Sequence, residues 1–257
     1  MMINGIDPVL SALRGLSCPA PAGLSAKVFT RWVATPSPLG ELYVAFTGTG
    51  VQFVRTAESV DGDPAAFAEA YRRRFARPLR TADRAPAGLL PALRGRRGTG
   101  LLLDLSALSD FERDVLAATR GIPAGETRPY GWVAREAGRP RAAHAVGSVL
   151  ARNPVPLLVP CHRVVRADGR LGEYLFGPAH KEKLLRGEDA NLDDVLAYAR
   201  QGMHYLGSDT TGVVCFPTCH QARRITPSHR HGFRTLADAA AAGYRPCRVC
   251  RPAVDAA

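Results

Sequence analysis

Four cysteines near the C-terminus restrict how this chain can fold. They form two close pairs, Cys215-x3-Cys219 and Cys247-x2-Cys250, and 27 residues separate the pairs. Such short spacings bring four thiolates together at little cost in loop entropy, and four thiolates suit tetrahedral Zn²⁺. We therefore predict a small domain built around one zinc ion. Four free thiols are the alternative, and a zinc that is purely structural is another.

Histidines near these cysteines compete as ligands only in principle. His220, His229 and His231 lie between the two pairs. The complete set of four cysteines leaves a tetrahedral ion no vacancy for them. We expect the histidines to serve other purposes.

The composition of the chain indicates which kind of partner it binds. The 257 residues carry a formal net charge of +11, mostly from arginine. Such a balance favours a polyanion, most simply nucleic acid, although a basic surface can also serve solubility. No apolar stretch is long enough for a membrane span, and no secretory signal opens the sequence. We expect a cytoplasmic protein whose cysteines are thiols or metal ligands, with no membrane partner.

The first part of the chain reads as α/β. Residues 28–54 alternate like strands, and Gly48 and Gly50 indicate a hairpin between two of them. Residues 64–75 read as an amphipathic helix, residues 76–100 as a solvated loop, and residues 101–105 as a closing strand. A short helix over residues 8–16, near the isolated Cys18, is predicted in a lead-in of 27 residues.

The next part is mainly helical. Ser109 and Glu112 form a capping box ahead of a helix. Two short helices are predicted at residues 131–136 and 141–152, joined by a turn with Gly138 and Pro140, as in a helix-turn-helix. A last helix covers residues 181–188. Many helical hairpins share this pattern, so it does not identify a DNA-binding motif by itself.

A rigid segment presents one more cysteine. The run from Asn153 to Val165 reads Asn-Pro-Val-Pro-Leu-Leu-Val-Pro-Cys-His-Arg-Val-Val. Its prolines restrict φ and remove backbone donors, so the segment that enters Cys161 is stiff. The neighbouring imidazole of His162 can help to generate a thiolate. The alternative is a buried cysteine beside an unrelated histidine.

This string resembles the acceptor motif of O6-alkylguanine-DNA alkyltransferases. The resemblance extends from Val28 to Glu188, and includes Gly125-Glu-Thr, Tyr130-Gly and Ala145-Val-Gly in the family's order. It implies an α/β domain over residues 28–105 and a mainly α catalytic core with a helix-turn-helix over residues 106–190, after the lead-in over residues 1–27.

The resemblance also implies roles for single residues. Cys161 would accept the alkyl group from guanine O6, His162 would deprotonate it through a bound water, and Glu188 would orient the imidazole. Tyr130 would donate to the departing guanine, Asn153 would hold the turn before the acceptor, and Tyr174 would line the base pocket. Each is also compatible with an ordinary packing or surface role.

The chain departs from the family at one DNA-contacting position. The family places an arginine before Ala-Val-Gly, where it fills the gap left by a flipped base, and here that residue is His144. Histidine is shorter and only partly charged. We expect His144, Arg141, Arg152 and Tyr174 to contact DNA, with a surface role for His144 as the alternative.

The C-terminal part, residues 199–252, resembles the zinc domain of Ada proteins. Thr210-Thr-Gly-Val-Val-Cys215 and the Tyr244-Arg-Pro-Cys247 segment carry this resemblance. It implies that Cys215 accepts a methyl group from a DNA phosphotriester, while the other three cysteines remain ligands. The segment His229-Arg-His-Gly departs from the family pattern. We expect a linker over residues 191–202 and a small four-cysteine zinc domain over residues 203–257, with eight arginines and two acids between Arg200 and Pro252.

These observations together predict a DNA-repair alkyltransferase. It would act once per molecule, as a monomer, on double-stranded DNA that contains alkylated bases, and guanine dealkylation would need no cofactor. A non-enzymatic alkylation sensor and a zinc-structured DNA-binding module are the alternatives.

Overall fold

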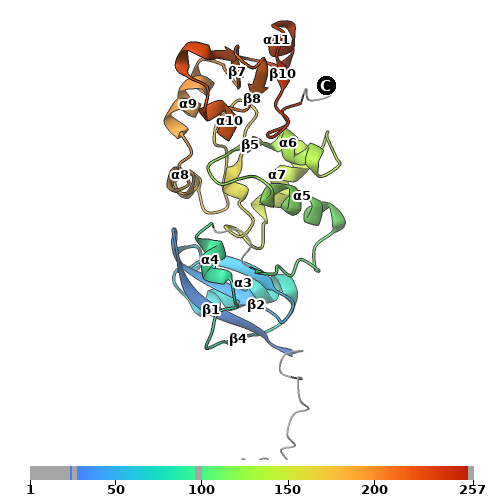
Figure 1. Cartoon of the computed structure of the whole chain (residues 1–257). Helices are drawn as coiled ribbons and strands as arrows, with labels where there is room; N and C mark the ends of the chain where they lie inside the picture. The colour runs from blue at the N-terminus through green and yellow to red at the C-terminus, as the bar shows by residue number, and fades with distance from the viewer. Residues whose placement is uncertain (1–23, 25–27, 96–99, 254–257) are drawn as a thin grey trace, which may run out of the picture.

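The computed structural model describes residue 24 and residues 28–95 and 100–253. Figure 1 shows a sheet with its helix at one end, a group of helices in the middle, and a smaller sheet at the other end. The predicted helix over residues 8–16 and Cys18 lie outside the described residues. Within the described part, no helix is long and apolar enough to cross a membrane.

The first sheet has the strand order β3-β2-β1-β4. It comprises β1 (Thr30–Ser37), β2 (Gly40–Phe46), β3 (Val51–Thr56) and β4 (Leu79–Thr81), with the short 3-10 helix η1 (Glu58–Val60) after β3. β2 and β3 pair antiparallel, so the predicted hairpin is confirmed. The predicted helix is α3 (Pro64–Phe75), which Asp63 caps and which buries Phe67 and Tyr71 against the sheet.

Two predictions in the next segment are wrong. Residues 76–95 are not all solvated loop, because they contain β4 and the short helix α4 (Leu89–Leu93). Leu89 and Leu93 lie one helical turn apart and are buried in the core, although prolines and arginines dominate their surroundings. Residues 101–105 form a single bridge from Leu103 to Val51 rather than a strand.

The middle part of the chain contains four helices. They are α5 (Asp110–Arg120), α6 (Tyr130–Glu136), α7 (Ala143–Ala151) and α8 (Pro178–Gly187). The capping box of Ser109 and Glu112 is present at the start of α5. The second helix of the predicted pair begins two residues later than expected, which leaves Arg141 in the turn between α6 and α7. Short strands β5 (Arg128–Pro129) and β6 (Val164–Val165) pair in parallel.

The last part of the chain follows helix α9 (Leu192–Arg200). Its four strands are β7 (Tyr205–Ser208), β8 (Val213–Cys215), β9 (Arg230–Phe233) and β10 (Arg245–Pro246), and they form a sheet in the order β10-β8-β7-β9. The helices of this part are α10 (His220–Arg223), the 3-10 helix η3 (Pro227–His229) and α11 (Leu236–Ala241). One buried apolar cluster includes Val33 of β1, Leu116 of α5 and Cys250. The three parts therefore share a continuous core.

Candidate active site and metal centre

Asn153 and the proline-rich loop fix the position of Cys161. The loop leaves the end of α7 and returns through Pro160 to the 3-10 helix η2 (Cys161–Arg163). The Asn153 side-chain amide donates to the Val159 carbonyl at 3.1 Å and to Cys161 Sγ at 3.3 Å, while its oxygen accepts from Val155 N at 3.0 Å. Asn153 is fully buried. One side chain thus closes the loop and contacts the sulfur.

His162 is paired with a carboxylate. His162 Nε2 lies 2.9 Å from Glu188 Oε1, at the end of α8. Arg163 donates to both oxygens of Glu188 at 2.7 and 2.9 Å, and its third contact is the Ile122 carbonyl at 2.6 Å. His162 Nδ1 is buried and has no hydrogen-bond partner among the described residues. An orienting carboxylate with an unpaired ring nitrogen is the arrangement that a general base needs.

Burial controls the protonation of this group. It raises the pKa of Cys161, against the opposing hydrogen bond from Asn153, and it lowers the pKa of His162, against the opposing contact with Glu188. Burial alone would raise the pKa of Glu188, but the hydrogen bonds from His162 and Arg163 outweigh it and bring that pKa to about 2. At neutral pH the resting site therefore holds a neutral thiol, a neutral imidazole and an ionised carboxylate.

A cavity of about 110 Å³ opens onto the thiol. Tyr130, Gly147 and Cys161 line it together with Tyr174. Burial raises the pKa of both tyrosines, so both keep their hydroxyl protons. The Tyr174 hydroxyl has no partner among the described residues. The sequence-predicted acceptor and both tyrosines thus line one pocket.

Three predicted DNA-contacting residues lie outside this cavity. Arg141, His144 and Arg152 are exposed, in the turn before α7, on α7 and directly after it. Arg152 Nε donates to the Ser148 carbonyl at 3.3 Å, and the Arg152 carbonyl accepts from Arg74 at 2.8 Å. These exposed side chains are available to a partner, and they do not line the cavity at the thiol.

Lys181 is a site residue that sequence analysis missed. Its side chain is fully buried, and its ammonium donates to the carbonyls of Val164 and Glu173. Burial lowers the pKa of Lys181 to about 8, although Cys161 and Glu173 oppose the shift. Lys181 stands two helical turns before Glu188, so the face of α8 that carries Glu188 also carries this lysine. That spacing was the available signal.

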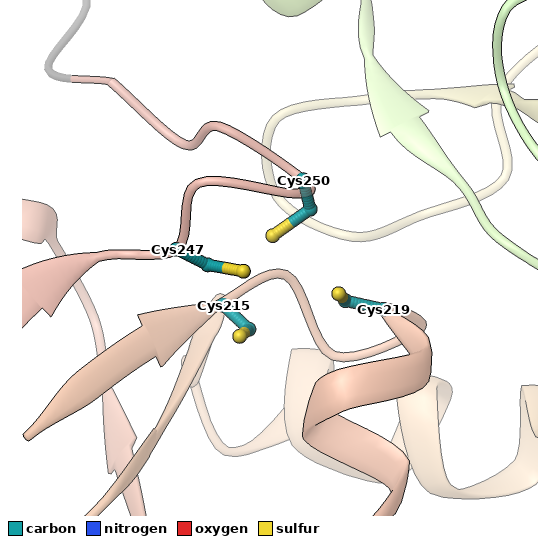
Figure 2. Close-up of side chains that lie close together, drawn as sticks. All are labelled: Cys215, Cys219, Cys247 and Cys250. Carbon is teal, nitrogen blue, oxygen red and sulfur yellow. The ribbon is translucent and has the colours of Figure 1, made fainter. Parts of the chain in front are cut away.

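The four C-terminal cysteines converge. Figure 2 shows Cys215, Cys219, Cys247 and Cys250 pointing toward one another from β8, the start of α10 and the loop after β10. All four are buried, and their sulfurs lie within 4.8 Å of one another. Hydrogen bonds from Cys215 and Cys250 lower the pKa of Cys219. This donor set fits a tetrahedral zinc ion.

Each of the three histidines contacts a carboxylate, and His220 also lies with Glu126 within 4.8 Å of the Cys219 sulfur. His229 and His231 pair with Asp209 at 2.8 and 3.3 Å. His220 Nδ1 contacts Glu126 Oε1 at 3.0 Å. Among the described residues, the four cysteines are the complete thiol set around this point.

A second cavity, of about 600 Å³, lies over the metal centre. Cys215 and Cys247 line it, whereas Cys219 and Cys250 do not. Its other lining residues include three arginines and three threonines: Arg224, Arg245, Arg248, Thr210, Thr211 and Thr226. Two of the four cysteines therefore line a basic groove.

Two family models match this chain in tandem. Residues 110–190 match the 6-O-methylguanine DNA methyltransferase DNA-binding domain, and residues 197–253 match the metal-binding domain of Ada. The first match contains the Asn153, Cys161, His162 and Glu188 group, and the second contains the four-cysteine centre.

Individual relatives agree with these matches. The bifunctional transcriptional activator/DNA repair enzyme Ada of Escherichia coli is 33% identical over 186 residues, which cover 66% of this chain and 50% of that protein. A methylated-DNA–protein-cysteine methyltransferase of Methanosarcina barkeri is 46% identical over 84 residues, which cover 33% of this chain and 53% of that protein. The chain thus spans about half the length of the curated relatives it matches.

One solved structure resembles about two thirds of this chain. It is Mycobacterium tuberculosis OGT in complex with DNA, with a TM-score of 0.51 and 32% sequence identity. The match covers 65% of this chain and 98% of that one. A protein of this fold has therefore been seen bound to DNA.

Proposed function

This chain belongs to the methylated-DNA–protein-cysteine methyltransferase family, and from that premise we propose that Cys161 removes alkyl groups from O6-alkylguanine in DNA. The observation that carries the proposal is the buried group itself. Asn153 contacts the Cys161 sulfur, and His162 pairs with Glu188 beside it. Tyr130 and Tyr174 line the cavity at the thiol.

The transfer is a direct displacement. The Cys161 thiol gives its proton to His162 through an intervening water, and the thiolate attacks the alkyl carbon. The bond between that carbon and guanine O6 breaks, and its electron pair stays on the guanine. Tyr130 donates a hydrogen bond or proton to the departing ring, while Glu188 stabilises the imidazolium. The product is a stable thioether, so each molecule reacts once and no cofactor is consumed.

The substrate is double-stranded DNA with the damaged base turned out of the stack. The thiol is buried, and its sulfur needs a collinear approach to the alkyl carbon, which a stacked base cannot offer. Three exposed residues lie on and around α7: His144, Arg141 and Arg152. There they can contact the DNA phosphates and the gap that the extruded base leaves in the duplex. Tyr174 faces the extruded base. We propose that the protein acts as a monomer.

Mass spectrometry after exposure to O6-methylguanine duplex tests the main proposal. The peptide that contains Cys161 should gain one methyl group, and Cys161→Ala should lose transfer while still binding DNA. Transfer by Cys161→Ala at the wild-type rate would refute the assignment.

A second activity is proposed for Cys215, because it borders the basic groove over the metal centre. Cys215, Cys219, Cys247 and Cys250 would hold the zinc, which when bound keeps sulfur as a nucleophilic thiolate. The arginines of the groove would bind a DNA phosphotriester. The methyl carbon would pass to the Cys215 sulfur, and its former oxygen would remain on a phosphodiester. Labelling of Cys215 by methyl phosphotriester DNA in the Cys161→Ala background tests this step.

These activities would belong to a core over residues 106–190 and a zinc domain over residues 203–257. The α/β domain over residues 28–105 and the linker over residues 191–202 complete the arrangement. The main rival is an alkylation sensor that changes its DNA affinity when methylated. DNA-binding assays with and without a methylating agent separate the two, because a repair protein needs no such change.

A further inference from the structure

A buried polar interface joins the metal centre to the alkyltransferase core. Thr127 N donates to Thr218 Oγ1 at 2.8 Å. Glu126 Oε1 accepts from the backbone and ring of His220 at 3.1 and 3.0 Å. Glu126 also lies within 4.8 Å of the Cys219 sulfur and forms a buried ion pair with Arg128. Buried polar groups are costly to leave unpaired, so this interface is specific.

The same segment contacts the acceptor site. Gly125 N donates to Glu188 Oε2 at 3.1 Å. Gly125 has φ +71°, and a Cβ there would lie 2.5 Å from the Glu188 carbonyl oxygen, so only glycine permits this approach. Next to Gly125, Arg223 of α10 donates to the Asp189 carbonyl at 3.1 Å, directly after Glu188 in the chain. The carboxylate that orients His162 is thus held by a segment docked on the metal domain.

A second connection reaches the helix that carries Tyr130. Trp132 Nε1 donates to the Cys250 carbonyl at 2.9 Å, across a buried contact. Arg135 donates to the Arg251 carbonyl at 2.6 Å, and Arg251 forms an ion pair with Glu136. Figure 1 shows α6 beside the end of the described chain. The loop that contains Cys250 therefore binds helix α6 through two hydrogen bonds and an ion pair.

We propose that the metal domain is a positioning element of the Cys161 site, acting through Thr218, Arg223 and Trp132. This inference rests on the proposed alkyl transfer to Cys161. The four cysteines and their metal cross-link the loops that hold Glu126, Thr127 and Trp132 in place. When that cross-link is lost, Glu188 and Tyr130 lose part of their fixed placement and transfer slows.

Single-turnover kinetics with free O6-benzylguanine tests the inference. The free base carries no phosphates, so the rate of transfer from it does not depend on any contact between the metal domain and DNA. Thr218→Val removes the hydroxyl and leaves Thr127 N unpaired, and it should slow transfer about three- to tenfold, the effect of one lost hydrogen bond. Thr218→Ser keeps the hydroxyl and should restore the wild-type rate. Arg223→Gln should slow transfer by a similar factor.

The control for lost charge is Arg120→Gln, because Arg120 is exposed at the end of α5. Its rate with the free base should stay at the wild-type value. Thermal unfolding and bound zinc should be measured for every variant, so that a misfolded protein is not read as a slow one.

Competition for the metal supplies an independent readout. Coupling between two sites affects the binding free energy at both of them equally. Thr218→Val should therefore also lose its zinc to a chelator more readily than Thr218→Ser. Equal free-base rates and equal zinc retention for the two variants would overturn the inference. Failure of the proposed function looks different, because wild-type protein would then gain no alkyl group at Cys161 at all.

Discussion

The side-chain amide of Asn153 donates to the sulfur of Cys161 across 3.3 Å. The hydrogen bond favours the thiolate and opposes the burial that raises the Cys161 pKa. Because the same side chain also closes the loop through Val159 and Val155, the shape of the loop and the reactivity of the thiol depend on one residue.

Replacement of Asn153 by aspartate should therefore slow transfer and shift its pH dependence. A carboxylate cannot donate to the sulfur and repels a thiolate, so the Cys161 pKa rises and the rate–pH curve moves to higher pH. We expect at least a tenfold loss near neutral pH, about the effect of one pKa unit plus loop disturbance. Stopped-flow rates across the pH range measure it. An Asn153→Asp curve that overlays the wild-type curve would contradict this role.

Glu188 should make the fold sensitive to acid. Its pKa is lowered to about 2 from an ordinary value of 4.5. A group with a lowered pKa in the folded state stabilises the protein above its unfolded pKa and loses that contribution as pH falls toward the folded pKa. The contribution is roughly 3 kcal/mol at neutral pH.

Urea unfolding of wild type and Glu188→Gln at several pH values measures this effect. The wild type should lose stability between about pH 4.5 and 2, and the variant should lose less over the same interval. Glu188→Gln should also be less stable near neutral pH, because Arg163 loses its charged partner. Parallel pH profiles for the two proteins would refute the assignment.

His144 should limit base extrusion from duplex DNA. It is exposed on α7, where the resemblance to the family implies an arginine, and a shorter imidazole side chain fills the gap left by the base less well than a guanidinium. His144→Arg should keep or raise the rate on O6-methylguanine duplex, and His144→Ala should lower it. The free base is the control, since it needs no extrusion. If His144→Ala repairs duplex DNA as fast as wild type, His144 does not fill the gap left by the flipped base.

Metal analysis should find about one zinc per chain. Cys247→Ser should lose it, because one of four converging sulfurs is replaced by a weak oxygen ligand. Cys161→Ser, at the other thiol site, should keep the metal and provides the control. Full zinc retention by Cys247→Ser would show that the centre is assembled differently.

Local patterns in the sequence predicted several elements well. Helix α3 has the predicted bounds, and α5 begins at the predicted capping box. The hairpin at Gly48 and Gly50 is present. These features depend on interactions within a few residues, which periodicity and capping residues encode directly. Helix α4 was missed because its two buried leucines lie in a segment rich in proline and arginine.

The chemistry was also visible before the structure. The spacing of the two cysteine pairs predicted the metal site, and the resemblance of the Pro-Cys-His-Arg string to the alkyltransferase acceptor motif predicted the role of Cys161. The spacing of Lys181 and Glu188 on one helical face was available but says nothing about burial. The structure added that Lys181 is fully buried near the thiol, which depends on how α8 packs.

The sequence by itself determined which thiols are the candidates for reaction and for metal binding, because thiol chemistry and ligand spacing are local properties. Only the tertiary structure decided how the two sites meet. Thr127 and Thr218 are 91 residues apart, and Trp132 and Cys250 are 118 apart. No local pattern encodes such pairs, since they form only when a shared core buries both partners and requires each polar group to find a match.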